Sequence, residues 1–190
     1  MNDSFFAMMS RMKYINRWAL MRNTDYESLS EHSLEVAIIA HALTVIRNTR
    51  FGGNLSPEKA ATLALFHDVP EILTGDMPTP VKYHDEEIRN AYKRVEAASV
   101  EKLLSMLPED LRSTYAELLS PNDAQYKKII KAADKLSALI KCTEERRAGN
   151  MEFVSAEAST LKLIEQCDVP EALVFLKEFM PAYSRTLDEQ

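Results

Sequence analysis

The chain has 190 residues, of which 46% are hydrophobic and 27% charged, and this balance is typical of one soluble globular domain with a buried core. The net charge of −6 disfavours extended nucleic-acid binding, which needs a basic surface to displace counterions. Only 4 Gly and 8 Pro argue against a β-sandwich or β-barrel, because those folds need many tight turns.

Membrane and cysteine patterns favour a cytoplasmic protein. No apolar run approaches the roughly 18 residues of a membrane span, and the first residues lack the basic region that begins a signal peptide. The two cysteines, Cys142 and Cys167, have no CxxC spacing and are interpreted as buried thiols in a reducing cytosol.

A first amphipathic helix is predicted over residues 4–15, where apolar residues repeat at intervals of three and four. Trp18, the only tryptophan of the chain, follows Arg17 directly. One interpretation is a packed indole beside a solvated arginine. The other is a guanidinium that binds phosphate next to a flat wall for a sugar or base.

The next predicted helix begins at Ser30 as N-cap, with Glu31 in its first turn. It is apolar nearly all round, with a stripe of Leu34, Ile38, Ala42 and Val45, which predicts an interior helix. His32 lies in the first turn. His41 comes nine residues later, about half a helical revolution away, so we interpret it as a structural or surface residue.

A third helix begins at Ser56-Pro57, with Ser as N-cap and Pro at the first helical position. Its small, apolar run leads to His67 and Asp68. Pro70 lacks an amide hydrogen, so we expect this helix to end or kink at the histidine-aspartate pair, which helps both side chains reach one ion. The following stretch, 73–80, is too rich in Gly and Pro for a helix.

The rest of the chain predicts helices at 85–107, 108–119, 123–147, 152–166 and 169–180, and thus one all-α domain over residues 1–190. On the first of them we interpret one set of charges as a solvated face: Glu86, Glu87, Arg89, Lys93, Arg94 and Glu96. Residues 144–147 are interpreted as a solvated helix end. Asp134 lies beside an apolar stripe, where a carboxylate is costly unless it is paired or bound to metal.

Two imidazoles and two carboxylates on three predicted helices form a candidate metal site, namely His32, His67, Asp68 and Asp134. This mixed nitrogen and oxygen set suits Mn, Fe, Co, Zn or Ni better than Ca. Glu71, four residues after His67, is the candidate for positioning or deprotonating a water molecule. Taken alone, the same residues also fit scattered core histidines and exposed acids.

The order His32, His67-Asp68, Asp134 resembles the H…HD…D signature of the HD-domain phosphohydrolases. The match is closer to the bacterial 5′-deoxyribonucleotidases of the YfbR type, and it covers nearly the whole chain. The segments that carry it are Asn16-Arg17-Trp18, Ser30-Glu31-His32-Ser33-Leu34, Phe51-Gly52-Gly53-Asn54, His67-Asp68, Glu71 and the run from Leu73 to Tyr83.

This resemblance implies an all-helical HD fold with a metal-site core at about 28–145, usually as a homodimer. It implies hydrolysis of deoxyribonucleoside 5′-monophosphates to deoxynucleoside and phosphate, with selection against ribonucleotides. The implied cofactor is one divalent transition metal on the four ligands above, Co²⁺ or Mn²⁺ first, with Zn²⁺, Fe²⁺, Ni²⁺ or Cu²⁺ also compatible.

The resemblance also assigns roles to single residues. Glu71 matches the catalytic acid, Arg17 the residue that orients the phosphate, and Trp18 the one that lines the sugar. Asp68 belongs to the catalytic set as well. The loop that contacts the nucleotide matches Asp76, Met77, Pro78 and Thr79, with Asp76 as partner of the 3′-hydroxyl, and the ligands His32, Asp68 and Asp134 also contact substrate. The chain departs from the enterobacterial pattern at Val69-Pro70.

Two other functions remain open at this stage. One is an HD-domain phosphodiesterase or nucleotide pyrophosphohydrolase that acts on another small nucleotide, although the chain lacks the GYP-type motif of the cyclic-dinucleotide enzymes. The other is a helical scaffold that keeps a relic metal site. The expected partner of the enzyme is a small-molecule nucleotide substrate, and neither polymeric nucleic acid nor a membrane is expected.

Overall fold

The computed structural model describes residues 3–82 and 84–190, so Met1, Asn2 and Tyr83 of the sequence motifs lie outside it. Its described residues are mainly helical, with one isolated antiparallel bridge between Asn16 and Ser28. The α-helices are α1 Phe5–Met9, α2 Leu29–Phe51, α3 Pro57–Leu65, α4 Glu71–Thr74, α5 Thr79–Lys82, α6 Glu86–Leu104, α7 Glu109–Leu119, α8 Ala124–Arg147, α9 Val154–Glu165 and α10 Pro170–Glu178. The 3₁₀-helices are η1 Ser10–Tyr14, η2 Met151–Phe153, η3 Met180–Ser184 and η4 Leu187–Glu189.

The chain divides into two compact units. Unit 1 contains Met1–Arg22, Tyr26–Ser33 and Phe66–Asn122, and unit 2 contains Asn23–Asp25, Leu34–Leu65 and Asp123–Gln190. The single domain over 1–190 therefore stays a prediction, and each unit is described by itself.

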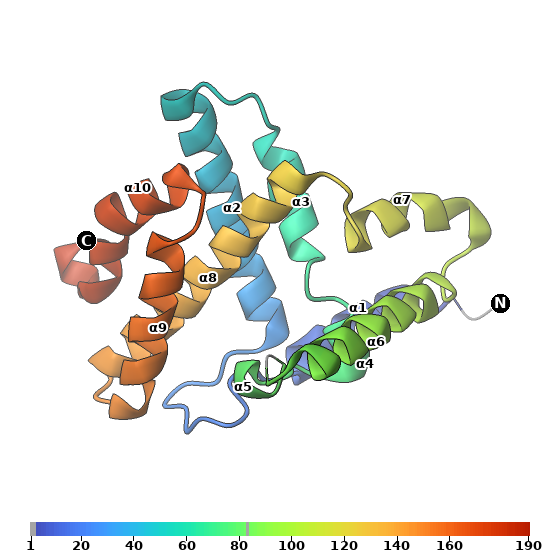
Figure 1. Cartoon of the computed structure of the whole chain (residues 1–190), viewed down its shortest axis with the longest axis horizontal. Helices are drawn as coiled ribbons and strands as arrows, with labels where there is room; N and C mark the ends of the chain where they lie inside the picture. Colours follow the sequence, from blue (N-terminus) through green and yellow to red (C-terminus); the bar gives the residue numbers. More distant parts are fainter. Residues whose placement is uncertain (1–2, 83) are drawn as a thin grey trace. The chain divides into compact units, whose positions relative to one another are not determined.

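The core of unit 1 joins α1 and η1 to α4, α6 and α7 (Figure 1). Its buried side chains are Phe5, Met12, Leu29, Val69, Ile72, Val100, Leu103, Leu104, Leu107 and Leu119. Tyr115 of α7 packs edge-on against Phe5, with the ring centroids 5.0 Å apart. This packing fixes the chain on both sides of the turn that carries His67 and Asp68.

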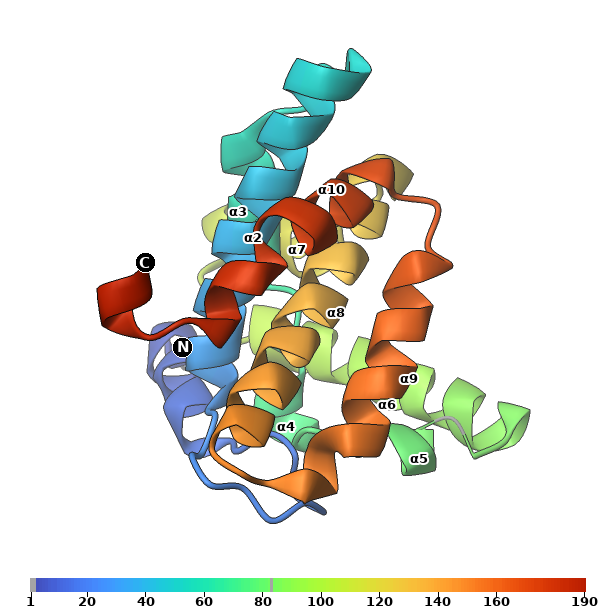
Figure 2. The ribbon, with the colours of Figure 1, turned by 90° about the vertical axis from the view of Figure 1, so that its left-hand side faces the viewer.

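In unit 2, α9 runs beside α8, and α10 contacts both (Figure 2). On α8, the apolar stripe that the sequence predicts is buried, namely Ile129, Ala133, Leu136 and Ile140. Arg47 of α2 donates to Oε1 of the fully buried Glu171 on α10 at 3.0 Å. Cys142 is buried as expected, whereas Cys167 is half-buried, and the two form no disulfide.

The start of α2 differs from the prediction. Its N-cap is Ser28 and not Ser30: the amide of Glu31 donates to Ser28 Oγ at 3.3 Å, and the amide of Ser28 donates to Glu31 Oε2 at 2.8 Å. This Ser-x-x-Glu capping box satisfies the amide groups of both residues. Ser28 is therefore a better N-cap than Ser30. The helix ends at Phe51, and the following Gly52 has a φ of +68°, which suits a residue without a side chain.

The predicted buried stripe of α2 is also wrong. Leu34 and Ile38 are 57% and 62% exposed, and Val45 is exposed as well, while Val36, Ala40 and Leu43 of the same helix are fully buried. A helix that is apolar nearly all round does not reveal which side faces the core. His41 is exposed, as expected.

α2 is also long and apolar enough to cross a membrane by length and composition, so the expectation that no apolar run approaches that length was wrong. However, 56% of its most apolar window is buried inside the structure. A core helix of a soluble protein meets the same criteria, so this single helix is weak evidence for a membrane span.

The helix boundaries around the histidine-aspartate pair follow the sequence. Ser56 Oγ accepts the amide of Lys59 at 3.0 Å, and α3 ends at Leu65, directly before a turn over 66–70. The stretch 73–80 is only partly irregular. α4 forms one helical turn before residues 75–78, and α5 forms one after them. A proline at the start of a helix loses no hydrogen bond, so Pro70 and Pro80 permit these turns.

Candidate metal centre

Three of the four predicted metal ligands come together in unit 1. His32 lies in the first turn of α2, and His67 and Asp68 lie in the turn after α3. His67 Nε2 is 3.1 Å and His32 Nε2 is 3.5 Å from Asp68 Oδ2. One ligand atom from each residue falls within 4.8 Å of the others, so the group could hold a metal ion.

The two histidines stabilise the ionised form of the Asp68 carboxylate. Burial raises the pKa of Asp68, but the charge of His67 and the hydrogen bonds from His32 and His67 outweigh it and hold that pKa well below its usual range. His32 is fully buried, and the imidazole nitrogens of both histidines face the same carboxylate oxygen. Two imidazoles and one carboxylate that converge in this way fit a divalent transition metal.

Asp134, the fourth predicted ligand, is half-buried on α8 in unit 2. It is not one of the three residues that the structure brings together. Its ligand role therefore remains a prediction.

Arg17 and Trp18 also belong to unit 1, next to the three ligands. Arg17 Nη1 lies 3.6 Å from Asp68 Oδ2. Trp18 has a φ of +59°, a left-handed conformation that bulky residues rarely adopt. Its backbone amide donates to Asp76 Oδ2 at 3.3 Å. Arg17 is therefore not the solvated arginine of the first interpretation, because it is half-buried and paired with acids.

Glu27 is the acid that sequence reasoning missed here. Its Oε2 accepts Arg17 Nε–H at 3.1 Å and the indole N–H of Trp18 at 2.9 Å. Its Oε1 lies 3.7 Å from His32 Nδ1. The only signal in the sequence is that Glu27 directly precedes the capping box of α2, and that position does not reveal these partners.

Glu71 is buried, with only 6% of its surface exposed, and its Oε2 has no hydrogen-bond partner among the described residues. Burial raises the pKa of Glu71 to about 9, and the charges of Asp68 and Asp76 add to the rise. This carboxyl group therefore carries a proton at neutral pH. Pro70 is the N-cap of α4, and Glu71 is the first residue of this helix.

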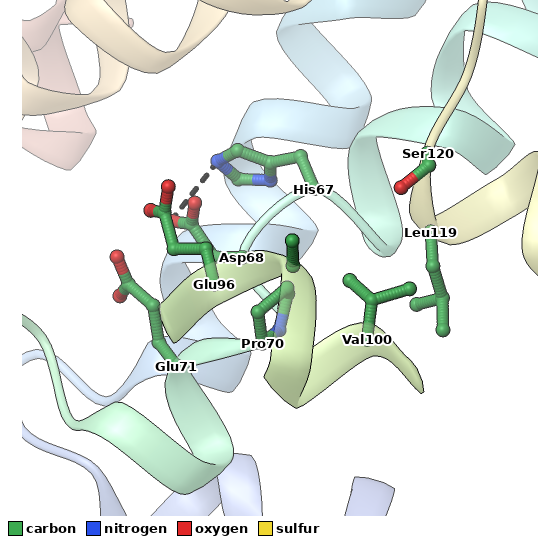
Figure 3. A pocket seen from close by; sticks show the side chains of 9 residues that line it. His67, Asp68, Pro70, Glu71, Glu96, Val100, Leu119 and Ser120 are labelled. Atoms are coloured by element: carbon green, nitrogen blue, oxygen red, sulfur yellow. Dashed lines mark ion pairs between the residues drawn. The ribbon is translucent and has the colours of Figure 1, made fainter. Parts of the chain in front are cut away.

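A pocket of about 280 Å³ opens beside His67, Asp68 and Glu71. Figure 3 shows the carboxylates of Asp68, Glu71 and Glu96 on one side of it. On the other side lie Val100, Leu119 and Ser120. The pocket thus joins acidic groups to an apolar wall.

Glu96 was expected on a solvated face, and that prediction is wrong. It is half-buried on α6, lines the pocket and pairs with Lys82 of α5 at 3.0 Å. Burial lowers the pKa of Lys82, but the hydrogen bond and charge of Glu96 outweigh it, so that the pKa lies above its usual value. Lys82 also lies over the ring of Tyr92, 4.6 Å from its centroid.

The predicted nucleotide loop lies between α4 and the start of α5. Asp76, Met77 and Pro78 are half-buried, and Thr79 is exposed. Asp76 contacts Trp18, so this loop and the Arg17-Trp18 segment meet within unit 1. The substrate contacts of this loop stay a prediction.

Comparison with known proteins identifies the family. Residues 4–183 match the family model described as 5′-deoxynucleotidase YfbR-like. This chain belongs to the YfbR-like 5′-deoxynucleotidase family. It is accordingly a hydrolase, as expected from the sequence.

Full-length relatives in this family support the assignment. The chain is 49% identical over 190 residues to a 5′-deoxynucleotidase of Erwinia tasmaniensis, with 99% of this chain and 96% of the relative covered. It is 46% identical over 187 residues to a 5′-deoxynucleotidase of Yersinia pestis, with 97% and 95% covered.

Solved structures confirm the predicted all-α HD fold. An HD-domain phosphohydrolase from Listeria innocua is 27% identical and superimposes with a TM-score of 0.82, with 95% of this chain and 88% of that chain covered. An HD phosphohydrolase of cyanophage S-2L, bound to dA and one catalytic Zn²⁺ ion, is 19% identical with a TM-score of 0.69 and shares the fold over 95% of this chain and 96% of its own.

Proposed function

We propose that this YfbR-like 5′-deoxynucleotidase hydrolyses deoxyribonucleoside 5′-monophosphates to deoxynucleoside and phosphate, with one divalent transition metal on His32, His67, Asp68 and Asp134. The observation that carries the proposal is the convergence of His32, His67 and Asp68 beside Arg17. A divalent cation at this position supplies Lewis-acid polarisation of a phosphoryl oxygen and lowers the pKa of water. Co²⁺ and Mn²⁺ are our first candidates, because carboxylate and imidazole ligands suit both.

Arg17 orients the phosphate in this proposal. Its Nη1 lies 3.6 Å from Asp68 Oδ2, on the side where a phosphate next to the ligands would lie. Its Nε donates to Glu27, so we assign the terminal nitrogens to the phosphate. A planar guanidinium binds two phosphate oxygens with parallel hydrogen bonds.

Glu71 acts as the proton donor. Water attacks the phosphorus, the bond between phosphorus and O5′ breaks, and the leaving oxygen needs a proton. The carboxyl group of Glu71 holds that proton at neutral pH because burial raises its pKa to about 9. The attacking water releases a proton, which reprotonates the Glu71 carboxylate.

Trp18 selects deoxyribose by exclusion. A rigid indole against C2′ of the sugar leaves no room for a 2′-hydroxyl. Its strained backbone and its two hydrogen-bonded anchors hold it in one orientation. Asp76, which binds its backbone, is the proposed partner of the 3′-hydroxyl.

The test of the proposal is phosphate release from dAMP, dTMP and AMP after the protein is stripped of metal and supplied with Mn²⁺ or Co²⁺. We expect release from the deoxy substrates only, and none after EDTA or in Asp68→Ala. No release from any monophosphate despite a bound metal would refute the nucleotidase, and cyclic nucleotides would then be the next substrates.

Assembly and compartment are part of the same proposal. We infer a cytoplasmic homodimer, and the support is the family resemblance together with the reducing compartment that the two thiols suggest, since neither is in a disulfide in the described part of the chain. Sedimentation velocity of the purified chain tests the dimer, and a monomer at micromolar concentration would contradict it.

A further inference from the structure

We propose that Glu27 is a positioning residue that orients Arg17, Trp18 and His32 together. Through it, phosphate binding, sugar selection and ligand geometry depend on one carboxylate. The inference rests on the proposed function for the roles of these three residues. The geometry of Glu27 itself does not depend on that function.

Both oxygens of the Glu27 carboxylate face side chains of the site. Oε2 accepts Arg17 Nε–H at 3.1 Å and Trp18 Nε1–H at 2.9 Å, and Oε1 faces His32 Nδ1 at 3.7 Å. The side chain is only 13% exposed, Arg17 is 12% exposed and His32 is fully buried. Hydrogen bonds to an ionised acceptor are stronger than neutral ones, and burial strengthens them further.

Glu27 binds Arg17 through Nε, whereas the proposed phosphate contacts use the two terminal nitrogens. Nε bonds to Glu27, while Nη1 lies 3.6 Å from Asp68. Because the guanidinium is planar, fixing Nε also fixes the direction of the two terminal nitrogens. Glu27 therefore sets where the phosphate-binding fork points.

Hydrogen bonds at its backbone and at its indole hold Trp18 in an unfavourable backbone conformation. Its φ of +59° persists only if surrounding groups fix it, and Asp76 accepts its backbone N–H at 3.3 Å. Glu27 fixes the other end of the residue through the indole N–H at 2.9 Å. Loss of this hydrogen bond removes the contact of the indole N–H with a carboxylate, and a reoriented ring would not exclude a 2′-hydroxyl.

His32 presents opposite nitrogens to two carboxylates. Nδ1 faces Glu27, and Nε2 faces Asp68 at 3.5 Å. In the metal-free protein Nε2 serves as a hydrogen-bond donor to Asp68. With a metal bound, the carboxylate near Nδ1 would keep the ring proton on that nitrogen and leave the Nε2 lone pair for the metal. Loss of such an outer carboxylate commonly lowers metal affinity by about 10–100-fold.

A purely structural role of Glu27 predicts a different result for its variants. Glu27 would then be one more buried ion pair, and its loss would lower stability without changing the sugar preference. Glu171 on α10 provides the matched comparison, because it is a fully buried carboxylate paired with an arginine, Arg47, at 3.0 Å in unit 2.

The experiment compares Glu27→Gln and Glu27→Asp with Glu171→Gln in the full-length protein. Three quantities are measured: Trp18 fluorescence, Mn²⁺ affinity by calorimetry, and the ratio of kcat/KM for dAMP to that for AMP. Because Trp18 is the only tryptophan, its emission reports the indole environment whether or not the protein is active.

We expect Glu27→Gln to shift the Trp18 emission, to weaken Mn²⁺ binding by about 10–100-fold and to lower the deoxy preference at least 10-fold. Glu171→Gln leaves all three unchanged. Glu27→Asp keeps the charge but is one carbon shorter, so it recovers only part of each effect and serves as the folded variant if Glu27→Gln does not fold.

Unchanged emission, Mn²⁺ affinity and sugar preference in folded Glu27 variants would overturn the proposal. So would an equal loss in Glu171→Gln. If the wild-type protein hydrolyses no deoxynucleotide, the proposed function fails, while the emission and the Mn²⁺ affinity still decide the role of Glu27.

Discussion

The backbone N–H of Trp18 donates to Asp76 Oδ2 at 3.3 Å, although 58 residues separate the two in the sequence. Burial raises the pKa of Asp76, and the charge of Arg17 together with this hydrogen bond works against the rise. Trp18 is the non-glycine residue with positive φ in the described part of the chain. The proposed partner of the 3′-hydroxyl thus also stabilises the backbone of the residue proposed to select the sugar.

Removal of Asp76 is expected to weaken binding of the sugar. In Asp76→Ala we expect kcat/KM for dAMP to fall by about 10–100-fold, since a buried hydrogen bond to a charged group is worth about 1.5–3 kcal/mol. The check uses 2′,3′-dideoxy-AMP as second substrate. If Asp76 binds the 3′-hydroxyl, the variant loses much less on the dideoxy substrate than on dAMP, and equal losses would contradict the contact.

Substitution of Trp18 separates steric selection from hydrogen bonding. Trp18→Ala is expected to accept AMP and dAMP at similar rates, because the wall against C2′ is gone. Trp18→Phe keeps an aromatic ring but loses the donor to Glu27, so we expect an intermediate preference. Kinetics with both substrates provide the measurement, and a Trp18→Ala enzyme that still strongly prefers dAMP would refute steric selection.

The raised pKa of Glu71 predicts a pH-dependent cost to stability. Between about 4.5 and 9 the folded protein keeps a proton that the unfolded chain releases, so wild-type stability falls as pH rises through this window. Glu71→Gln lacks this titration. In metal-free protein its free energy of unfolding, relative to the wild type, is expected to rise with pH, by an amount on the order of a few kcal/mol at pH 9.

Urea unfolding at pH 5, 7 and 9 measures that difference, and parallel curves for the two proteins would contradict the raised pKa. The same variant is expected to lose most of its activity. A neutral amide replaces the protonated carboxyl group in shape but donates no proton to O5′. A stabilised and inactive variant is a known outcome of strain at an active site.

Glu145 predicts the opposite dependence on pH. It was expected on a solvated helix end, but it is buried on α8, where Lys141, Asn150 and the amides of Thr24 and Asp25 donate to it. Burial raises the pKa of Glu145, but these hydrogen bonds outweigh it and lower that pKa to about 2. Its stabilising effect is therefore present above about pH 4.5 and is lost as pH falls towards 2.

Glu145→Gln is expected to lower the free energy of unfolding at pH 7 by about 2–4 kcal/mol and to reduce its loss on acidification. The control is Glu178→Gln, which breaks an exposed ion pair with Arg50 and should change the stability much less, because solvent screens exposed charges. Urea titrations at pH 7 and pH 3 compare them. Equal effects of both variants would show that burial of Glu145 adds nothing.

Metal binding by the four proposed ligands is expected to stabilise the protein. Added Mn²⁺ raises the free energy of unfolding by about 2.7 kcal/mol when its concentration is 100 times Kd. Asp68→Asn and Asp134→Asn should each remove most of this gain. Thermal melts with and without Mn²⁺ test Asp134 in particular, since a wild-type shift in Asp134→Asn would exclude it as a ligand.

Local sequence signals determined most of the helices and part of the site. Ser56-Pro57 begins α3, Pro70 separates His67-Asp68 from α4, and the charges and apolar repeats of 85–107 predict α6. Caps, proline geometry and helical periodicity act between residues a few positions apart. For this reason they can be read without a structure.

The tertiary structure decided which acids belong to the site and which side of α2 is buried. Glu27, Glu96 and Glu145 all sit in charged, apparently solvated sequence contexts, yet each is at least half-buried with partners from another segment. A carboxylate's environment depends on groups that arrive from distant parts of the chain. The amino-acid sequence therefore determined the helices and the histidine-aspartate pair, whereas only packing determined the carboxylates that surround it.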